Sequence, residues 1–179
     1  MNLSKLKELE DLKAELGSLS NKRGTLIQDK VSECIANARE DFKKFFSSKG
    51  FSVYSTGEHL VAKYKSFTVN LDFPKPDEGF IGYYSVWDLK VNDEKYLVVL
   101  NDLGKYPRFK ATTYPTPKTE DEKIQVEINQ IKQRIKDIEK DIEEIGQKPW
   151  GYGLRKEMIK DFNYPQYETF ASLLENLFN

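Results

Sequence analysis

The first 48 residues carry apolar side chains at helical spacing, in two stripes on either side of a mostly polar run at residues 18–24. The first stripe comprises Leu3, Leu6, Leu9, Leu12, Leu16 and Leu19, and the second comprises Ile27, Val31, Cys34, Ala38, Phe42 and Phe45. Gly17 is a typical residue for a helix end, and Thr25 with Gln28 forms a candidate capping box. The pattern therefore predicts two helices, the first over residues 3–17.

Between residues 50 and 114 the apolar period changes to two, which is typical of strands with one buried face. Apolar and polar residues alternate from Phe67 to Phe73, and Asn92-Asp93-Glu94 is a hairpin signal. The expected strands cover residues 51–55, 59–64, 67–73, 81–91, 96–100 and 108–114. Because the connections between them are short, we expect an antiparallel meander of five or six strands packed on a helix.

A strict isoleucine repeat follows the sheet region. Thr119 and Glu122 form a second candidate capping box, and Gly146 ends the apolar pattern, so a helix is expected over residues 119–146. Its isoleucines alternate at spacings of four and three: Ile124, Ile128, Ile131, Ile135, Ile138, Ile142 and Ile145. This seven-residue repeat predicts a coiled coil.

The isoleucine seam fits a partner within the chain or a second copy. Within the chain, it would pack on the leucine face of residues 3–19, on residues 25–48 or on both, as a helical hairpin. Isoleucine at both core positions also favours self-association into three or four strands. We expect the hairpin, because the chain supplies its own leucine helix.

The last segment contains an aromatic–glycine loop at residues 150–153, a short helix near residues 154–162 and a final amphipathic helix, so residues 150–179 are expected to form a helical cap. The predicted fold class is α+β, in one domain over residues 1–179. Within it we expect coiled-coil elements at 3–17 and 119–146, a sheet region at 50–114 and the C-terminal cap.

Composition narrows the function classes. The 179 residues carry 28 basic and 29 acidic side chains, which gives a net charge of −1. We expect no membrane span and no secretory leader, because charged residues interrupt every apolar stretch. A lone Cys34 cannot form an internal disulfide, which favours a reducing, cytoplasmic location.

One segment has the composition of a nucleic-acid contact. Residues 105–118 contain four basic residues, no acidic residue and three aromatic rings. Cations for phosphates and flat rings for bases are what single-stranded nucleic acid requires. The candidate contact residues here are Tyr106, Arg108, Phe109 and Lys110, but the balanced overall charge makes nucleic-acid binding the alternative.

A nuclease-like pattern is also present. Asp77 and the Asp88-Leu89-Lys90 sequence match the PD-(D/E)xK nuclease pattern, in which two carboxylates hold a divalent metal and the lysine activates water. If residues 80–91 form one strand, however, Asp77 and Asp88 lie about 36 Å apart. We therefore expect no metal and no cofactor, and keep a metal-dependent nuclease as the weakest alternative.

The remaining reactive side chains are few. His59 is the single histidine, and without a second cysteine no zinc site can form within the chain. Cys34 lies on an apolar stripe, where we expect a small buried hydrophobe. A nucleophile pair of Cys34 and His59 stays open, with no local support.

Without a catalytic set, the sequence favours a non-enzymatic protein-interaction module. Trp150 and Tyr152 are candidate contact residues, because such rings are common at binding hot spots. The coiled coil, a sheet edge or this aromatic loop would engage a protein partner. Small size and missing chemistry suggest an adaptor or inhibitor encoded by a phage or other mobile element.

Overall fold

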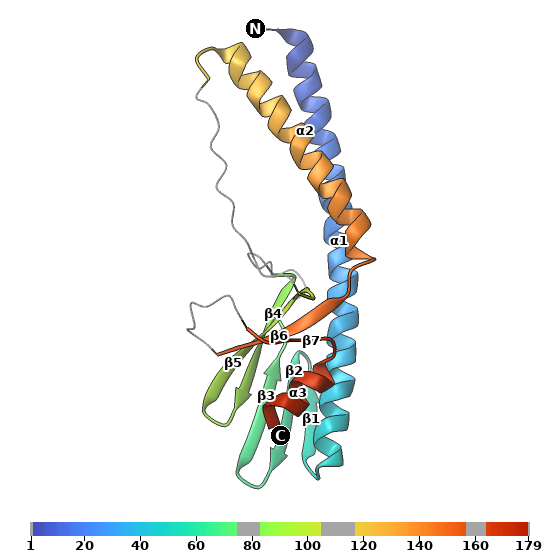
Figure 1. The fold of residues 1–179 in the computed structure, drawn as a ribbon, viewed down its shortest axis with the longest axis vertical. Coiled ribbons are helices and arrows are strands. Elements are labelled where there is room, and N and C mark those ends of the chain that lie inside the picture. Colours follow the sequence, from blue (N-terminus) through green and yellow to red (C-terminus); the bar gives the residue numbers. More distant parts are fainter. Residues whose placement is uncertain (1, 75–82, 105–116, 157–163, 179) are drawn as a thin grey trace. The chain divides into compact units, whose positions relative to one another are not determined.

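The computed structural model describes residues 2–74, 83–104, 117–156 and 164–178. Within these ranges the fold is α+β, with three helices and one seven-stranded antiparallel sheet (Figure 1). The helices are α1 (Leu3–Ser48), α2 (Glu120–Ile145) and α3 (Phe170–Phe178). The strands are β1 (Ser52–Thr56), β2 (His59–Tyr64), β3 (Phe67–Asp72), β4 (Ser85–Val91), β5 (Glu94–Asp102), β6 (Trp150–Lys156) and β7 (Gln166–Tyr167). None of the described helices is long and apolar enough to cross a membrane.

The chain forms two compact units, one of residues 1–28 and 109–147, the other of residues 29–108 and 148–179. Helix α1 contributes its first part to one unit and its second part to the other. The single domain predicted over residues 1–179 requires the two units to unfold together, and this stays a prediction.

The first unit is built on α2 and the beginning of α1. Its core contains Leu9, Ile124, Ile128, Ile131 and Ile135, with Leu6, Leu12, Leu16 and Leu19 packed against them. Three ion pairs join the helices: Glu8 with Lys132 at 2.6 Å, Lys13 with Glu127 at 3.1 Å, and Arg23 with Asp141 at 3.1 Å. The packing of isoleucines on leucines agrees with the sequence prediction.

The direction of the two helices differs from that prediction. The residue on α2 lies 124 positions after its partner in the Glu8–Lys132 pair, 114 after it in the Lys13–Glu127 pair and 118 after it in the Arg23–Asp141 pair. In a hairpin this separation would fall steadily from Glu8 to Arg23, but it is larger at Arg23 than at Lys13. The two helices run in the same direction and are therefore parallel (Figure 1). The hairpin prediction is therefore wrong. The long segment between α1 and α2 allows a parallel arrangement, which short connections forbid.

Helix α2 begins and ends as its sequence predicts. The Thr119 side chain accepts a hydrogen bond from the Glu122 backbone N–H, and the Glu122 carboxylate accepts one from the Thr119 N–H, both at 3.2 Å. This capping box satisfies two backbone donors that the helix leaves free. Gly146 caps the C-terminal end. The prediction of a helix over residues 119–146 is confirmed.

Helix α1 corrects the prediction of two N-terminal helices. It continues without a break through Gly17 and Gly24, and the Thr25 hydroxyl bonds the Asn21 carbonyl inside the helix instead of capping a new one. A glycine inside a helix costs only about 1 kcal/mol. The apolar stripe stays in phase from Leu19 to Leu26, so packing on both sides outweighs this cost.

The second unit contains the sheet, whose strands follow one another in chain order from β1 to β7. The predicted meander is confirmed for β1 to β5, although β4 begins only at Ser85. The strand expected at residues 108–114 lies outside the described residues. The sheet has seven strands instead of five or six because residues 150–156 and 166–167 add β6 and β7.

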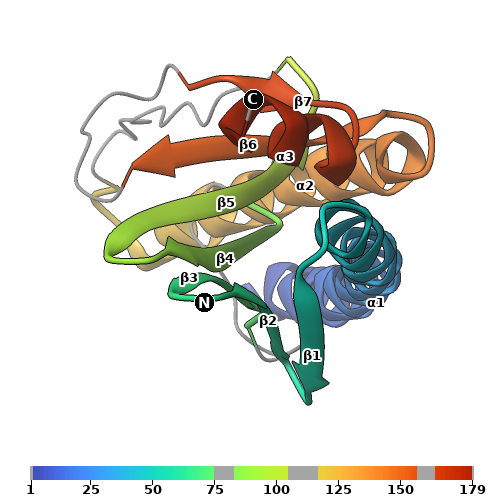
Figure 2. The same cartoon turned by 90° about the horizontal axis from the view of Figure 1, so that it is seen from below.

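The core of this unit lies on one face of the sheet. Buried residues of this face include Leu60, Ala62, Val69, Leu71, Trp87, Leu89, Val98, Leu100 and Tyr152. The second part of α1 and the whole of α3 cover this face (Figure 2). The Tyr152 hydroxyl donates to the Cys34 carbonyl at 3.3 Å, and the Phe170 ring lies 6.0 Å from the Trp87 ring.

The two helices of this layer are also joined directly. The rings of Phe46 and Phe178 lie 5.3 Å apart, and the Asp41 carboxylate accepts a hydrogen bond from the Ala171 N–H at 3.0 Å. Asp41 thereby places a negative charge at the beginning of α3, where the helix dipole favours one. The opposite face of the sheet carries polar side chains such as Lys63, Asp88 and Lys90.

Gly153 is predicted to be the least replaceable of the described glycines. A Cβ atom at this position would lie 2.2 Å from Cε2 of Tyr164 and 2.8 Å from Cγ2 of Val99. We expect Gly153→Ala to lower the free energy of unfolding by about 1–3 kcal/mol, measured by urea denaturation. Gly146→Ala is the control, because no atom lies within 4 Å of its Cβ position. Equal losses in both variants would contradict the close packing at Gly153.

Candidate functional site

The nuclease pattern does not assemble within the described residues. Asp88 and Lys90 both lie in β4 with exposed side chains, and Asp77 lies outside the described ranges. No group of three or more His, Cys, Asp or Glu side chains in the described part of the chain has the geometry to hold a metal ion. The described residues therefore give the nuclease alternative no support.

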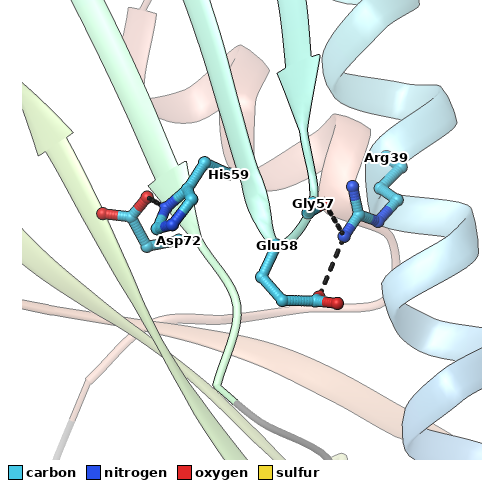
Figure 3. Close-up of polar contacts among 5 residues, drawn as sticks. All are labelled: Arg39, Gly57, Glu58, His59 and Asp72. Atoms are coloured by element: carbon cyan, nitrogen blue, oxygen red, sulfur yellow. Dashed lines mark hydrogen bonds and ion pairs between the residues drawn. The ribbon is translucent and has the colours of Figure 1, made fainter.

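His59 has a carboxylate partner that the sequence analysis did not anticipate. His59 Nδ1 lies 2.6 Å from Oδ1 of Asp72, its direct cross-strand neighbour on β3 (Figure 3). A carboxylate that orients an imidazole is one component of a catalytic dyad. The His59 side chain is 64% exposed and the Asp72 side chain 43%, and among the described residues no nucleophile bonds to His59. The pair lies on the polar face and ties β2 to β3.

Cys34 is buried in the second unit, as expected from its apolar stripe. Burial raises the pKa of its thiol, which disfavours the reactive thiolate. The pairing with His59 finds no support, because the Cys34 backbone contacts Tyr152 and the His59 side chain contacts Asp72.

Trp150 and Tyr152 lie in β6, so the prediction of an aromatic loop is wrong. Both rings are buried, and the Trp150 ring stacks on Tyr84 with 3.9 Å between ring centres. Burial, together with the neighbouring Cys34, raises the pKa of the Tyr152 phenol. The two rings serve as core and present no contact surface in this structure.

The basic candidates and the isoleucine seam have different outcomes. Tyr106, Arg108, Phe109 and Lys110 lie outside the described residues, so their role stays a prediction. Four seam isoleucines are in the helix-pair core, Ile145 is also buried, and Ile138 and Ile142 are half-buried. The seam is thus largely occupied by the leucines of α1.

Strand β1 provides a candidate interaction surface. It pairs with β2 on one side only, and four of its five residues are exposed, including Tyr54 with 58% of its surface accessible. Its sequence, Ser-Val-Tyr-Ser-Thr, contains no charged residue and no proline. Charges and prolines are the usual means by which proteins prevent an edge strand from pairing with another chain.

The turn after β1 fixes which of its backbone groups point toward β2. Gly57 and Glu58 form a two-residue turn between Thr56 and His59, and the positive φ of Gly57, 57°, suits the first central position of a type II′ turn. In such a hairpin the closing pair exchanges both backbone hydrogen bonds, and bonding then alternates along the strand. Thr56, Tyr54 and Ser52 therefore bond to β2.

The other two residues of β1 point their backbone groups the opposite way. By the same alternation, the N–H and C=O groups of Val53 and Ser55 face the open edge. The hydrogen bonds between β2 and β3 agree with this pattern. The Phe73 N–H donates to the Glu58 carbonyl at 3.0 Å, so even-numbered residues of β2 bond to β3 and odd-numbered residues bond to β1. Among the described residues, no backbone group from outside the sheet bonds to Val53 or Ser55.

Arg39 of α1 holds the turn that ends this edge. Its Nη2 atom donates to the Gly57 carbonyl at 2.9 Å and to the Glu58 carboxylate at 3.0 Å (Figure 3). The guanidinium also lies 4.6 Å from the centre of the Phe73 ring. Because the turn is fixed in advance, a strand that adds to β1 loses less free energy to ordering.

Comparison with protein-family models, with curated proteins and with solved structures gives no match for this chain. The strands predicted at residues 51–55 and 59–64 correspond to β1 and β2. The edge position of β1 was not predicted, since strand order depends on distant pairing. The Gly57-Glu58 turn was the local signal for this hairpin.

The Arg39 contacts predict a sensitive turn. Lysine keeps the charge at this position but loses the planar guanidinium that lies over the Phe73 ring while its Nη2 atom donates to the turn. We expect Arg39→Lys to lower the free energy of unfolding by about 1 kcal/mol and to speed amide hydrogen exchange at the β1–β2 turn.

The control for this prediction is Glu58→Gln, which removes the exposed ion pair but keeps the bond from Arg39 to the Gly57 carbonyl. Its expected cost is at most about 0.5 kcal/mol. Unchanged exchange at the turn in Arg39→Lys would show that Arg39 does not hold it.

Proposed function

We propose that this protein is a non-catalytic protein-interaction module that binds a partner by strand addition at β1. The observation that carries the proposal is the direction of the Val53 and Ser55 backbone groups, which face outward on an uncharged edge. An extended partner segment satisfies these groups by continuing the sheet, a common mode of peptide recognition. Adaptor and inhibitor roles in the cytoplasm both suit such a module.

Side chains next to this edge provide selectivity. Along a strand, alternate side chains point to opposite faces, so Ser52, Tyr54 and Thr56 share the polar face of the sheet. Tyr54 offers the largest exposed surface of the three, and tyrosine is common at binding hot spots. A partner residue directly beside Tyr54 therefore contributes most to recognition.

The helix pair of the first unit is proposed to be a two-stranded parallel coiled coil. In heptad terms, Leu9 and Leu16 occupy positions a of α1, and Ile128 and Ile135 occupy positions a of α2. The Glu8–Lys132 and Lys13–Glu127 ion pairs then each join a g position of one helix to an e position of the other. This is the charge pattern that sets partner and orientation in parallel coiled coils.

This assignment bears on the alternative of self-association through the isoleucine seam. Charged e and g positions flank the seam and already pair within the chain, which favours two strands over three or four. The leucine stripe of α1 takes the place of a second copy. In this proposal the two helices of the first unit are already paired with each other, and the partner binds elsewhere.

The coiled-coil assignment predicts a strong effect at its centre. Ile131 is buried in the seam, so Ile131→Asp places a carboxylate among leucine and isoleucine side chains. We expect a loss of at least about 3 kcal/mol in unfolding free energy, with reduced helical circular dichroism at 222 nm. Asn129→Asp adds the same charge at an exposed position of α2 and should leave the spectrum unchanged. Equal spectra for both variants would exclude a packed seam.

The edge proposal predicts that a single backbone N–H controls partner binding. Ser55→Pro removes an outward N–H and leaves the bonds to β2 intact, whereas Ser55→Ala keeps the N–H and removes only the hydroxyl. The full chain would be used to select binders from a random peptide library. We expect selected peptides to bind the wild type and Ser55→Ala, and to lose at least about tenfold in affinity for Ser55→Pro.

Two results would contradict strand addition at β1. Full peptide binding by Ser55→Pro would place the binding site elsewhere, and a selection that yields no peptide would remove peptide addition as the mode of binding. Circular dichroism of each variant verifies that the sheet remains folded.

The nucleic-acid alternative stays a prediction. Of the basic aromatic stretch, only Pro117 and Lys118 lie within the described residues. No contact of the described residues favours nucleic acid over a protein partner. The nuclease alternative also stays a prediction, because Asp77 lies outside the described residues.

A further inference from the structure

We propose that a second copy of this chain supplies the strand that pairs with β1, in an antiparallel contact centred on Tyr54. This inference rests on the proposed function, because it uses the same edge, and it names the partner. A two-fold axis through the Tyr54 pair would join the two sheets edge to edge.

The backbone pattern of β1 is complementary to itself. Two antiparallel copies centred on Tyr54 place Val53 of one copy opposite Ser55 of the other, and the reverse. Val53 and Ser55 are the residues whose N–H and C=O groups face the edge, so both cross-copy pairs exchange two hydrogen bonds. If the axis passed through Val53 or Ser55 instead, only that residue of β1 would lie opposite a residue with edge-facing backbone groups. The two copies would then form fewer hydrogen bonds.

The side chains fit the same register. Tyr54 lies opposite Tyr54 of the second copy in a non-hydrogen-bonded pair, the type in which side chains approach most closely. Aromatic cross-strand pairs stabilise antiparallel ladders, as do hydroxyl pairs such as Ser52 opposite Thr56. Because β1 contains no charged residue, the two-fold axis places no like charges directly opposite one another.

The symmetry of this contact also suits the layers of the second unit. A two-fold axis perpendicular to the sheet keeps the helices of both copies on the same side of the joined sheet. The sheet layer and the helical layer of one copy then each continue into those of the other. The isologous contact also closes on itself, so the assembly stops at two copies.

The experiment is sedimentation equilibrium of the full chain from about 10 μM to about 1 mM, since four backbone hydrogen bonds and one aromatic pair give a weak dimer. We expect a monomer–dimer equilibrium in the wild type. Tyr54→Lys and Tyr54→Glu each place like charges at the two-fold axis and should weaken the dimer at least about tenfold. An equimolar mixture of the two variants should restore it as a heterodimer.

Matched variants locate the contact. Tyr64→Lys and Tyr64→Glu make the same changes at another exposed tyrosine, on β2 instead of the edge, and should leave dimerisation unchanged. Ser55→Pro should abolish the dimer, whereas Ser55→Ala should keep it. The Val53 and Ser55 amides should exchange hydrogen at least about tenfold more slowly at high protein concentration than at low concentration.

Three outcomes would overturn the inference: a wild type that remains monomeric at about 1 mM, a dimer that survives Ser55→Pro, or a mixture of the Tyr54 variants that does not associate. The proposed function fails separately. If selected peptides bind in a manner that depends on the Ser55 N–H while the chain remains monomeric, strand addition stands and the second copy is not the partner.

Discussion

Burial of the apolar stripe of α1 is the interaction on which both compact units depend. Its first part supplies the leucines that cover Ile124, Ile128 and their neighbours in the first unit. Its second part supplies Phe42 and Phe46, which are fully buried in the second unit. Arg23 lies in α1 between these regions and pairs with Asp141, and the helix continues through this charged position.

The two edges of the sheet are treated differently. The edge at β7 is only two residues long, a length that offers little to another chain. The edge at β1 is longer and uncharged, and Arg39 fixes its turn. Such an edge is an aggregation risk unless a specific partner pairs with it. The contrast within one sheet is the reason to assign β1 an interaction role.

Local patterns predicted those parts of the fold in which the signal lies within a few residues. The Thr119–Glu122 capping box, the isoleucine seam and the hairpins of β1 to β5 are of this kind. The β6 strand was missed because Gly151 and Gly153 suggest a loop. In the structure these positions require glycine, because Leu103 and Tyr164 occupy the space beside them. The continuity of α1 depends on packing in both units, which no local window contains. The candidate site was missed for the same reason, since an edge is defined by which strand has no neighbour.

The wide separation of α1 and α2 along the chain has a consequence for synthesis of the protein. A leucine near the N-terminus meets its isoleucine partner more than a hundred residues later, as the Arg23–Asp141 pair illustrates. At ribosomal rates this interval is on the order of ten seconds. During that time the leucine stripe of the nascent chain has no partner of its own. The leucine stripe of α1 is thus accessible to chaperones and to other nascent chains until α2 has been synthesised.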